Sequence, residues 1–401
     1  MREPAIRSAA AGSDWSSSVS VRPITGEAER QAFLRLPWKV YADDPNWVPP
    51  LWRDHVRFFD PAYNVELEHI DFEPFVAWRG DEPVGTIVAF INHAYNDFQE
   101  AHAGWFGQFE LLDDEEAGHA LLRTAEDWVR ARGADTLIGP ATFSTNSEIG
   151  LLIDGFDTPP MVMMSHARPY YRPIVESYGG FETSMDLWAW HFDGEQWGGR
   201  EADRLPEKLS RVVHKIKERR DFTLRNPDPR RFDEEAERVK AIYNQAWARN
   251  WGFVPMSEAE MDRLAEELKP IIDPRIAFFV EKNGQTVAFG LPLPNLYEPL
   301  RKVQSRPGQP HWWQLAKLLW HWKVRGPLTS VRVWGLGVLE QYRGSGADAL
   351  LYYQMVKSGL PLGYVDIEMS WILADNDMMN RAIAMLGAQV YKTYRVYEKK
   401  L

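Results

Sequence analysis

The sequence contains no cysteine, so its 401 residues can form neither a disulfide nor a thiolate metal site, and no thiol can act as a nucleophile. It also lacks an apolar run of the about 18 residues that a transmembrane helix needs. Basic residues are too few to suit a nucleic acid, because 46 Lys and Arg stand against 57 Asp and Glu, a net charge of −11. The chemistry must therefore use oxygen and nitrogen groups.

The N-terminal residues are rich in alanine and serine but have no apolar segment of the signal-peptide kind, so we expect a flexible tail and a cytoplasmic protein. The ten histidines are dispersed, and none forms the helical pair with a carboxylate that metalloproteases use, so no metal is expected. Tryptophan, in contrast, is abundant. The 18 indoles indicate either aromatic cores or a pocket for a long apolar ligand.

Strand and helix patterns alternate along the chain, which predicts an α/β fold of the layered α+β kind, with mixed central sheets flanked by helices. Residues 74–78 and 84–90 predict a hairpin, and residues 277–281 and 287–291 predict a second one. The repeat of this order indicates a tandem duplication.

Two further pairs of segments support the duplication, namely Ala-Leu-Leu at 120–122 and 349–351, and the helix-ending glycines Gly180 and Gly387. The stretch from Ala-Leu-Leu to the glycine is longer in the first half than in the second, so the first half must carry an insertion. We place this insertion at 144–169 and expect it to be a long functional loop. The predicted organisation is a tail (1–18), a first domain (19–192) on the side of the acceptor substrate, a linker (193–220) and a second domain (221–401) with the cofactor site.

The strongest functional signal is a strand at 331–338, interrupted by Gly335 and Gly337, followed by the glycine-rich loop 341–347 and a helical pattern. Glycine inside a strand indicates a bulge or a close backbone approach. A glycine-rich turn at a helix N-terminus binds phosphate, because free N–H groups and the helix dipole converge there, and Arg343 would add positive charge.

This loop resembles the cofactor motif of the GNAT acyltransferase superfamily, which is Gln or Arg, two residues, Gly, one residue, then Gly or Ala; Gln341, Gly344 and Gly346 fill it. The segments 45–50 and 391–399 extend the likeness to a tandem bacterial branch. The resemblance implies that the loop holds the pyrophosphate of acyl-CoA, as acetyl-CoA or a longer chain, and that the strand end offers an N–H to the thioester. The implied cofactor residues are Val338, Leu339, Gln341, Arg343, Gly344, Ser345, Gly346, Ala347 and Asn376.

Acyl transfer to an amine needs a group that takes a proton, because an ammonium has no lone pair. Glu368 is the first candidate, since strand alternation places Asp366, Glu368 and Ser370 on one face. The alternative is a solvated or ion-paired strand face, and Glu340 is a weaker candidate.

The tyrosine that often protonates the leaving thiolate in the family is replaced here by Ile383. The resemblance therefore leaves the acid open among Tyr391, Tyr394 and Tyr397. Alternation predicts that 391 and 397 share one face of the last strand and that 394 lies on the other.

The first half replaces the glycine loop with three carboxylates at 114–116, which would repel a pyrophosphate, so we expect no CoA there. Its long loop instead carries candidate substrate-binding residues, Asn146, Asp154 and Tyr170. The alternative is an ordered structural loop.

A basic, Trp-rich helix is predicted at 311–325, with residues 312, 315, 316, 319 and 320 on one apolar face and Trp313 and Trp322 outside it. The helix resembles one that rests on anionic lipid, which would make the protein peripheral at the inner membrane face; packing against the other domain is the alternative.

The residues and the resemblance together predict an acyl-CoA-dependent N-acyltransferase that acts on a primary amine. The acyl donor is short or long, and the acceptor is a small molecule, lipid-like or amino-acid-like. The competing hypothesis is a non-catalytic protein that binds acyl-CoA or a metabolite on the same scaffold.

Overall fold

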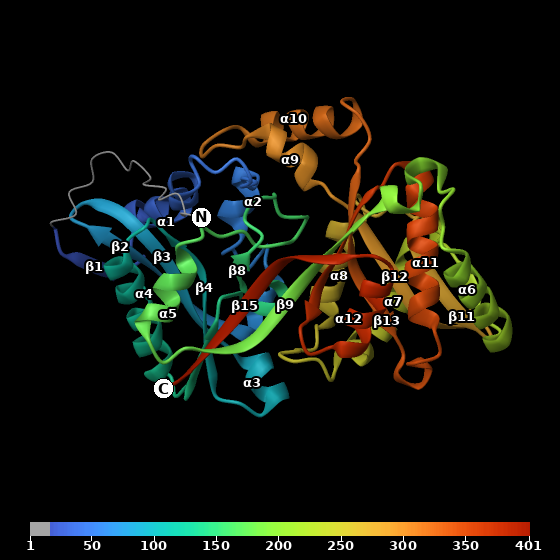
Figure 1. Cartoon of the computed structure of the whole chain (residues 1–401). Coiled ribbons are helices and arrows are strands. Elements are labelled where there is room, and N and C mark those ends of the chain that lie inside the picture. The colour runs from blue at the N-terminus through green and yellow to red at the C-terminus, as the bar shows by residue number, and fades with distance from the viewer. Residues whose placement is uncertain (1–16) are drawn as a thin grey trace, which may run out of the picture.

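The computed structural model describes residues 17–401 and shows two halves of similar design joined by one mixed sheet (Figure 1). The predicted tail, 1–18, lies almost wholly outside the described residues. The sheet has 13 strands in the order β1-β2-β3-β4-β5-β15-β9-β14-β13-β12-β11-β10, with β8 paired to β15. Strands β1 to β5 and β10 to β14 occupy mirrored places about the central pair, so the layered fold and the duplication are confirmed.

The elements of the first half are β1 (Val19–Pro23), α1 (Glu27–Val40), α2 (Trp52–Arg57), β2 (Ile70–Arg79), β3 (Glu82–Asn92), α3 (His93–Gln99), β4 (Ala103–Leu111), α4 (Glu115–Arg130), β5 (Thr136–Gly139), β6 (Ala141–Thr142), β7 (Ser144–Ile149), β8 (Leu151–Asp154), α5 (Tyr171–Tyr178) and β9 (Glu182–Asp193). Those of the second half are α6 (Glu207–Arg220), β10 (Thr223–Arg225), α7 (Phe232–Trp247), α8 (Glu258–Leu268), β11 (Phe278–Lys282), β12 (Gln285–Pro294), α9 (Tyr297–Val303), α10 (His311–Lys323), β13 (Ser330–Val338), α11 (Ala347–Gly359), β14 (Asp366–Leu373), α12 (Asp377–Met385) and β15 (Gln389–Lys400). Both predicted hairpins are present, as β2–β3 and β11–β12.

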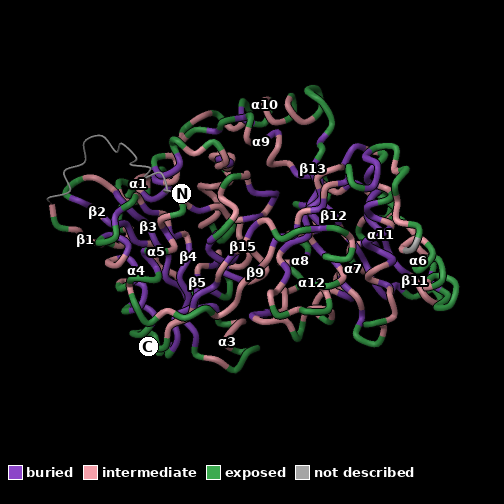
Figure 2. The backbone as a smooth tube through the Cα atoms, viewed as in Figure 1, coloured by how far each residue is buried: buried purple, intermediate pink, exposed green. Residues whose placement is uncertain are grey.

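The core follows the sheet through both halves (Figure 2). In the first half, the amphipathic helix α4 packs on β3 through an apolar stripe that includes Leu121, Leu122 and Val129, which are fully buried. In the second half, α11 packs on β12 with Leu350 and Leu351. The recurring Leu-Leu pair of the sequence is therefore the core face of equivalent helices.

The last strand of each half crosses into the other half. Strand β9 pairs with β14 of the second half, while β15 pairs with β5 and β8 of the first, and the two strands pair with each other through the centre of the molecule (Figure 1). The predicted domain limits stay a prediction, but the segment 193–220 is not an open linker, because part of it forms α6, which packs on α11.

The insertion at 144–169 is not a single loop, as the sequence led us to expect, because it contains β7 and β8. It is fixed to β15 by Lys392, which is buried and donates from Nζ to the carbonyls of Gly155 and Thr158. Burial lowers the pKa of this lysine to about 8, against the opposing effect of nearby carboxylates. The segment is therefore held as part of the scaffold between the halves.

Within residues 17–401, no helix combines the length and the apolar character that crossing a bilayer requires.

Candidate active site

A cleft opens where two parallel strands separate. Strands β13 and β14 pair only from Ser330 to Val333 and then diverge. On the other edge of β13, Leu291 faces Gly335 and the next residue faces Val333, which leaves Trp334 in a bulge, as the glycines of this strand predicted. The opening is a cavity of about 290 Å³ that we call the second-half cleft.

The glycine loop lies at one side of this cleft, which is lined by Val338, Arg343, Gly344 and Asn376. Helix α11 begins after Gly346, whose φ of 88° is in the left-handed region and which has no side chain to cap the first turn. The N–H of Ala347 donates to Ser345 Oγ at a long 3.4 Å, and the next two N–H groups of that turn are available to an anion. Arg343 is held beside the loop, because its Nη2 donates to the carbonyl of Ala246 at 2.7 Å.

The equivalent helix of the first half, α4, is capped by the protein itself. Asp114 accepts from the N–H of Ala117 at 3.1 Å and from the Nε and Nη2 of Arg79 at 2.8 and 2.9 Å. Glu116 also accepts from Arg79, at 2.9 Å. These contacts give a physical reason for the prediction that the first half binds no pyrophosphate, because its own carboxylates occupy the helix terminus.

A buried polar network lies under the bulge. Arg332 of β13 donates from Nε to Ser370 Oγ at 2.9 Å, and from Nη1 to the carbonyls of Val162 and Met163 at 2.8 and 2.9 Å. Its Nε is 3.8 Å from Glu368 Oε1, which also accepts from Ser370 at 2.6 Å. The network joins the strand that forms the cleft to the insertion of the first half.

Two tyrosines of β15 complete the network. Tyr391 donates to Glu368 Oε2, and Tyr394 is fully buried with a hydroxyl that has no hydrogen-bond partner among the described residues. Burial and the Glu368 carboxylate raise the pKa of both hydroxyls. Tyr397 points elsewhere and donates to Glu176 at 3.2 Å.

The predicted alternation of these tyrosines is therefore wrong. The register of β15 against β9 shifts between Val390 and Lys392 and again between Val396 and Tyr397. The first shift leaves Tyr391 as an extra residue of β15 and so breaks the two-residue period, because a bulge turns the following side chains to the other face. The second shift leaves Ser184 as an extra residue of β9.

Three more cavities lie near the second-half cleft, and two of them share wall residues with it. The central cavity, of about 350 Å³, shares Trp334, Ser370 and Trp371 with the cleft and is also lined by Arg332. The first-half chamber, of about 540 Å³, shares Glu148 and Tyr297 with the central cavity. A row of cavities with shared walls thus extends from the glycine loop into the first half, with polar groups at its centre.

Glu148 of β7 is the carboxylate that lines both the central cavity and the first-half chamber. Burial raises the pKa of its carboxyl above the ordinary value, and the positive charge of Arg332 offsets part of that shift. Deeper in the first-half chamber, burial raises the pKa of Glu110 to about 7, although Tyr171 donates to it at 2.8 Å. Glu110 can therefore exchange a proton near neutral pH.

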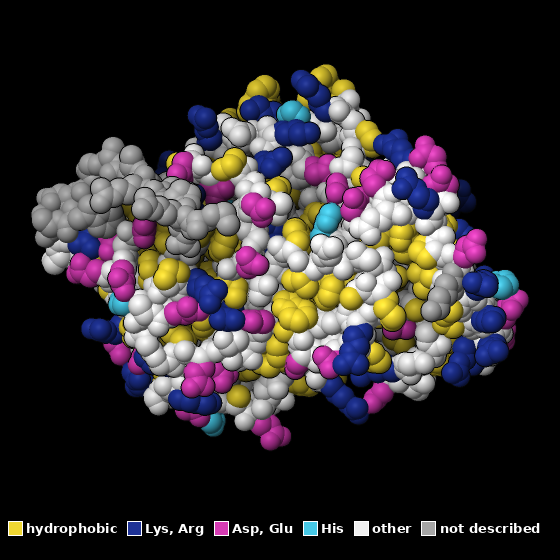
Figure 3. All heavy atoms as spheres, in the orientation of Figure 1, with side chains coloured by type: hydrophobic (Ala, Val, Ile, Leu, Met, Phe, Trp, Pro, Cys, Tyr) yellow, Lys and Arg dark blue, Asp and Glu magenta, His cyan; other side chains and the backbone are white. Residues whose placement is uncertain are grey.

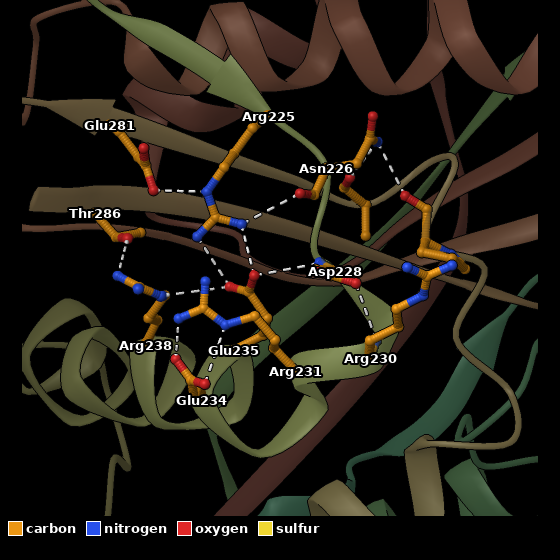
Figure 4. A network of polar contacts seen from close by, with 12 residues as sticks. Arg225, Asn226, Asp228, Arg230, Arg231, Glu234, Glu235, Arg238, Glu281 and Thr286 are labelled. Atoms are coloured by element: carbon orange, nitrogen blue, oxygen red, sulfur yellow. Dashed lines mark hydrogen bonds and ion pairs between the residues drawn. The ribbon is translucent and has the colours of Figure 1, made fainter. Parts of the chain in front are cut away.

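The fourth cavity, which we call the apolar chamber, has about 300 Å³ and meets the central cavity at Tyr243 and Trp334. Its walls come from α7, α8, β11 and β12, and they are formed largely by apolar side chains, such as Phe279 and Leu264. At its outer end, Arg225 binds Glu235 of α7 at 2.7 and 2.9 Å and Glu281 of β11 at 2.6 Å (Figure 4). This ion-pair network fastens the start of α7 over the sheet.

Comparison with known proteins places the chain among acyltransferase folds. It is 37% identical over 390 residues to the bacterial ceramide synthase of Caulobacter vibrioides, covering 96% of this chain and 98% of the relative. It is 34% identical over 385 residues to protein YghO of Escherichia coli, covering 95% of each. No family model matches the sequence.

Solved structures show the same tandem fold. A tandem GNAT protein from the clavulanic acid biosynthesis pathway superposes with a TM-score of 0.53 at 14% identity, over 96% of this chain and 98% of that one. The chain belongs to the family of the bacterial ceramide synthase, and its fold is the tandem GNAT fold. A GCN5-related N-acetyltransferase from Sphaerobacter thermophilus has a TM-score of 0.50 at 15% identity, over 95% of each chain.

In this tandem GNAT protein, the cofactor residues inferred from the motif fall into two groups. Val338, Arg343, Gly344 and Asn376 line the second-half cleft, whereas Gln341, Ser345, Gly346 and Ala347 shape the loop behind it. Leu339 differs from the expectation, because its N–H donates to the carbonyl of Val287 at 3.0 Å and is not directed to a thioester. Trp334, which the register shift leaves without a partner residue on β12, becomes the alternative candidate for that donor.

The other predicted residues of this GNAT protein are only partly brought together. Asn146 lines the central cavity and bonds the carbonyl of Val254 at 3.0 Å. Asp154 is exposed at the end of β8, and the hydroxyl of Tyr170 donates to the carbonyl of Leu111 at 2.7 Å, so neither lines this cavity. Glu368 is fully buried inside the network, which excludes the solvated strand face; its role as a base stays a prediction.

Two residues of this GNAT site were missed as catalytic candidates. Glu148 belongs to the segment that the sequence predicted as a long loop. The structure places it in β7, where it lines both the central cavity and the first-half chamber. Arg332 lies in a strand that otherwise consists largely of apolar and glycine residues. A single charged residue in such a buried strand was the signal that could have identified it.

Proposed function

We propose that this protein transfers an acyl group from acyl-CoA to the primary amine of a lipid-like acceptor and forms an amide. The observation that carries the proposal is that the central cavity shares walls with the second-half cleft and with the first-half chamber, and that Glu148 lines both the central cavity and that chamber. The donor enters along the glycine loop, and the acceptor approaches from the opposite side.

The residues at the junction suit the chemistry. The amine nitrogen attacks the thioester carbonyl, the C–N bond forms, the C–S bond breaks, and the amine proton passes to Glu148, whose raised pKa makes it a better proton acceptor. The N–H at the Trp334 bulge and the guanidinium of Arg332 lie on the side where negative charge develops on the carbonyl oxygen. The thiolate leaves as free CoA after it is protonated, and the partnerless hydroxyl of Tyr394 is our candidate for that proton.

Long apolar chains have room on both sides of the junction. The apolar chamber meets the central cavity beside Trp334 and suits the acyl chain of the donor. The first-half chamber combines apolar walls with Glu110 and Glu148, and so suits an acceptor with an amine and a long tail. A relative is named a ceramide synthase, and ceramide is the amide of a fatty acid with a long-chain amino alcohol, which supports this acceptor class.

The test is turnover of a long-chain acyl-CoA with a long-chain amino alcohol, followed by thiol release and by mass spectrometry of the amide. We expect Glu148→Gln to lower kcat by about 100-fold or more while the Kd for acyl-CoA is unchanged. Because the pKa of Glu148 is raised and the base must be deprotonated, wild-type kcat should rise as the pH rises through that pKa.

Glu340→Gln is the matched control, since Glu340 is exposed, pairs with Arg249 at 2.7 Å and lines none of the four cavities. Its kcat should equal that of the wild type. Tight binding of acyl-CoA without any amide from a panel of amines would instead favour the non-catalytic alternative. Equal kcat in Glu148→Gln and wild type would remove Glu148 as the base.

A further inference from the structure

Helix α10 presents an apolar face to solvent and turns the polar Gln314, together with Leu318 and Trp322, to the protein. Trp312 is 70% exposed, Trp320 53% and Leu319 52%, whereas Gln314 on the opposite side of the helix is 0% exposed. This arrangement is the reverse of an ordinary surface helix, whose apolar stripe faces the core. The predicted alternative, that the apolar face packs against the other domain, is therefore wrong, and Trp313, expected outside that face, is exposed with it.

The orientation of α10 is fixed by hydrogen bonds. Gln314 Oε1 accepts from the N–H of Trp52 at 3.1 Å, and its Nε2 donates to Ser305 Oγ at 2.8 Å. The carbonyl of Ser305 in turn accepts from Trp38 Nε1 at 2.7 Å. Because both bonds of Gln314 would be lost if the helix rolled over, the outward direction of the tryptophans is a property of the fold.

The exposed apolar side chains are concentrated on this helix. Of the large hydrophobic residues exposed within 17–401, those at and beside α10 are Trp312, Trp313, Leu315, Leu319, Trp320 and Val324. The others, Phe98, Val212, Met378, Met385 and Val390, are distributed over α3, α6, α12 and β15. Figure 3 shows hydrophobic and basic side chains side by side over α10. A concentrated patch of this kind marks an interaction surface.

The charge around the patch is positive. The segment from Arg301 to Arg325 contains no Asp or Glu, in a chain with a net charge of −11. Its basic residues are Arg301, Lys302, Arg306, Lys317, Lys323 and Arg325. A patch of tryptophan and leucine rimmed by lysine and arginine matches the headgroup and acyl boundary of an anionic bilayer, which attracts each basic side chain near its surface.

We propose that α10 docks this protein on the surface of an anionic lipid bilayer. The helix has 13 residues and a length of about 20 Å, so it lies in the interface and does not cross the hydrocarbon core. Leu318 of α10 and Leu300 of α9 line the first-half chamber. If the acceptor is lipid-like, which rests on the proposed function, docking places the bilayer next to the chamber that receives it.

The test is co-sedimentation of the full chain with vesicles of phosphatidylcholine alone and with added phosphatidylglycerol. We expect at least 10-fold tighter binding to the anionic vesicles, and a loss of at least 10-fold in the variant Trp312→Ser, Leu319→Ser, Trp320→Ser. Lys323→Glu with Arg325→Glu should weaken binding to anionic vesicles and leave binding to neutral ones unchanged. The matched control is Val212→Ser with Met385→Ser, which removes exposed apolar side chains elsewhere and should bind as the wild type.

Equal binding of the triple variant and the wild type, or no vesicle binding by the wild type, would overturn the proposal. So would light scattering that shows a wild-type dimer and a monomeric triple variant, because a second copy would then cover the helix. Vesicle binding needs no turnover, so its outcome is independent of the proposed reaction. With a short-chain acyl-CoA and a water-soluble amine in vesicle-free buffer, the triple variant should have the same kcat as the wild type. If neither protein is active, the result counts against the proposed acyl transfer and not against membrane docking.

Discussion

Gly344 offers a direct test of the anion site, because it lines the second-half cleft and has a close structural control. Its φ is 68°, and a Cβ added there would meet no atom within 4 Å. Gly284, in the turn between β11 and β12, has a φ of 77° and equally open space, but it lies outside the cleft. Gly346 is unsuitable, since its Cβ would lie 2.7 Å from Ile216 of α6 and would disturb packing.

Replacing either glycine with glutamate adds the same backbone strain, about 1 to 2 kcal/mol for a left-handed residue. Only Gly344→Glu puts a carboxylate beside the pyrophosphate of a bound donor. Two like charges about 4 Å apart repel by about 4 kcal/mol at the effective dielectric of a protein surface, and salt screens part of this. We therefore expect a loss of about 2 kcal/mol or more, which is a Kd at least about 30-fold higher.

The assay is calorimetric titration with CoA at two salt concentrations, together with thermal unfolding of both variants. Gly344→Glu should bind CoA more weakly than the wild type, and this difference should be smaller at high salt. Gly284→Glu should bind CoA as the wild type does, and the two variants should unfold at similar temperatures. Wild-type affinity in Gly344→Glu would refute the placement of pyrophosphate at this loop. An equal loss in both variants would attribute the effect to backbone strain and would likewise refute the electrostatic argument.

Two further predictions concern the buried polar network around Arg332 and the apolar chamber. Glu368→Gln removes the buried carboxylate that faces Arg332, so the free energy of unfolding should fall by about 3 kcal/mol in urea titrations, and an unchanged value would show that the pair contributes nothing. Ala265→Phe narrows the apolar chamber, so kcat/KM for a long-chain acyl-CoA should fall about 10-fold relative to a short-chain one. Ala384→Phe, at an exposed position of α12 outside the chamber, should leave that ratio unchanged.

The sequence predicted those parts of the site that depend on local signals. The strand with two glycines, the loop and the following helix are found as β13, the glycine loop and α11, because each is specified by turn chemistry and periodicity over a few neighbouring residues. Asn376 lines the cleft as the N-cap of α12 and accepts from the N–H of Met379 at 3.2 Å, while its part in cofactor binding stays a prediction.

The parts that the sequence did not predict depend on contacts between distant segments. The residues of β9 and β15 do not indicate that each strand pairs with a strand of the other half. Strand propensity shows that a segment forms a strand, but it does not select the partner strand. The bulge of β15 at Tyr391 has no signal in the local pattern, and it brings Tyr391 and Tyr394 to the same network although alternation separates them. Glu148 becomes a candidate base only because β7 is folded against the second half.

The duplication explains how two clefts can serve one reaction. In the first half, β4 and β5 pair in parallel from Ala103 to Trp105, and residues beyond that point, including Gln108 and Pro140, line the first-half chamber. This is the counterpart of the opening between β13 and β14, but Asp114 closes its phosphate position. A cleft that keeps its shape while it gains carboxylates disfavours an anionic donor and favours a cationic amine. On our proposal, one copy retained the donor site and the other became the acceptor site, and the two meet at Glu148.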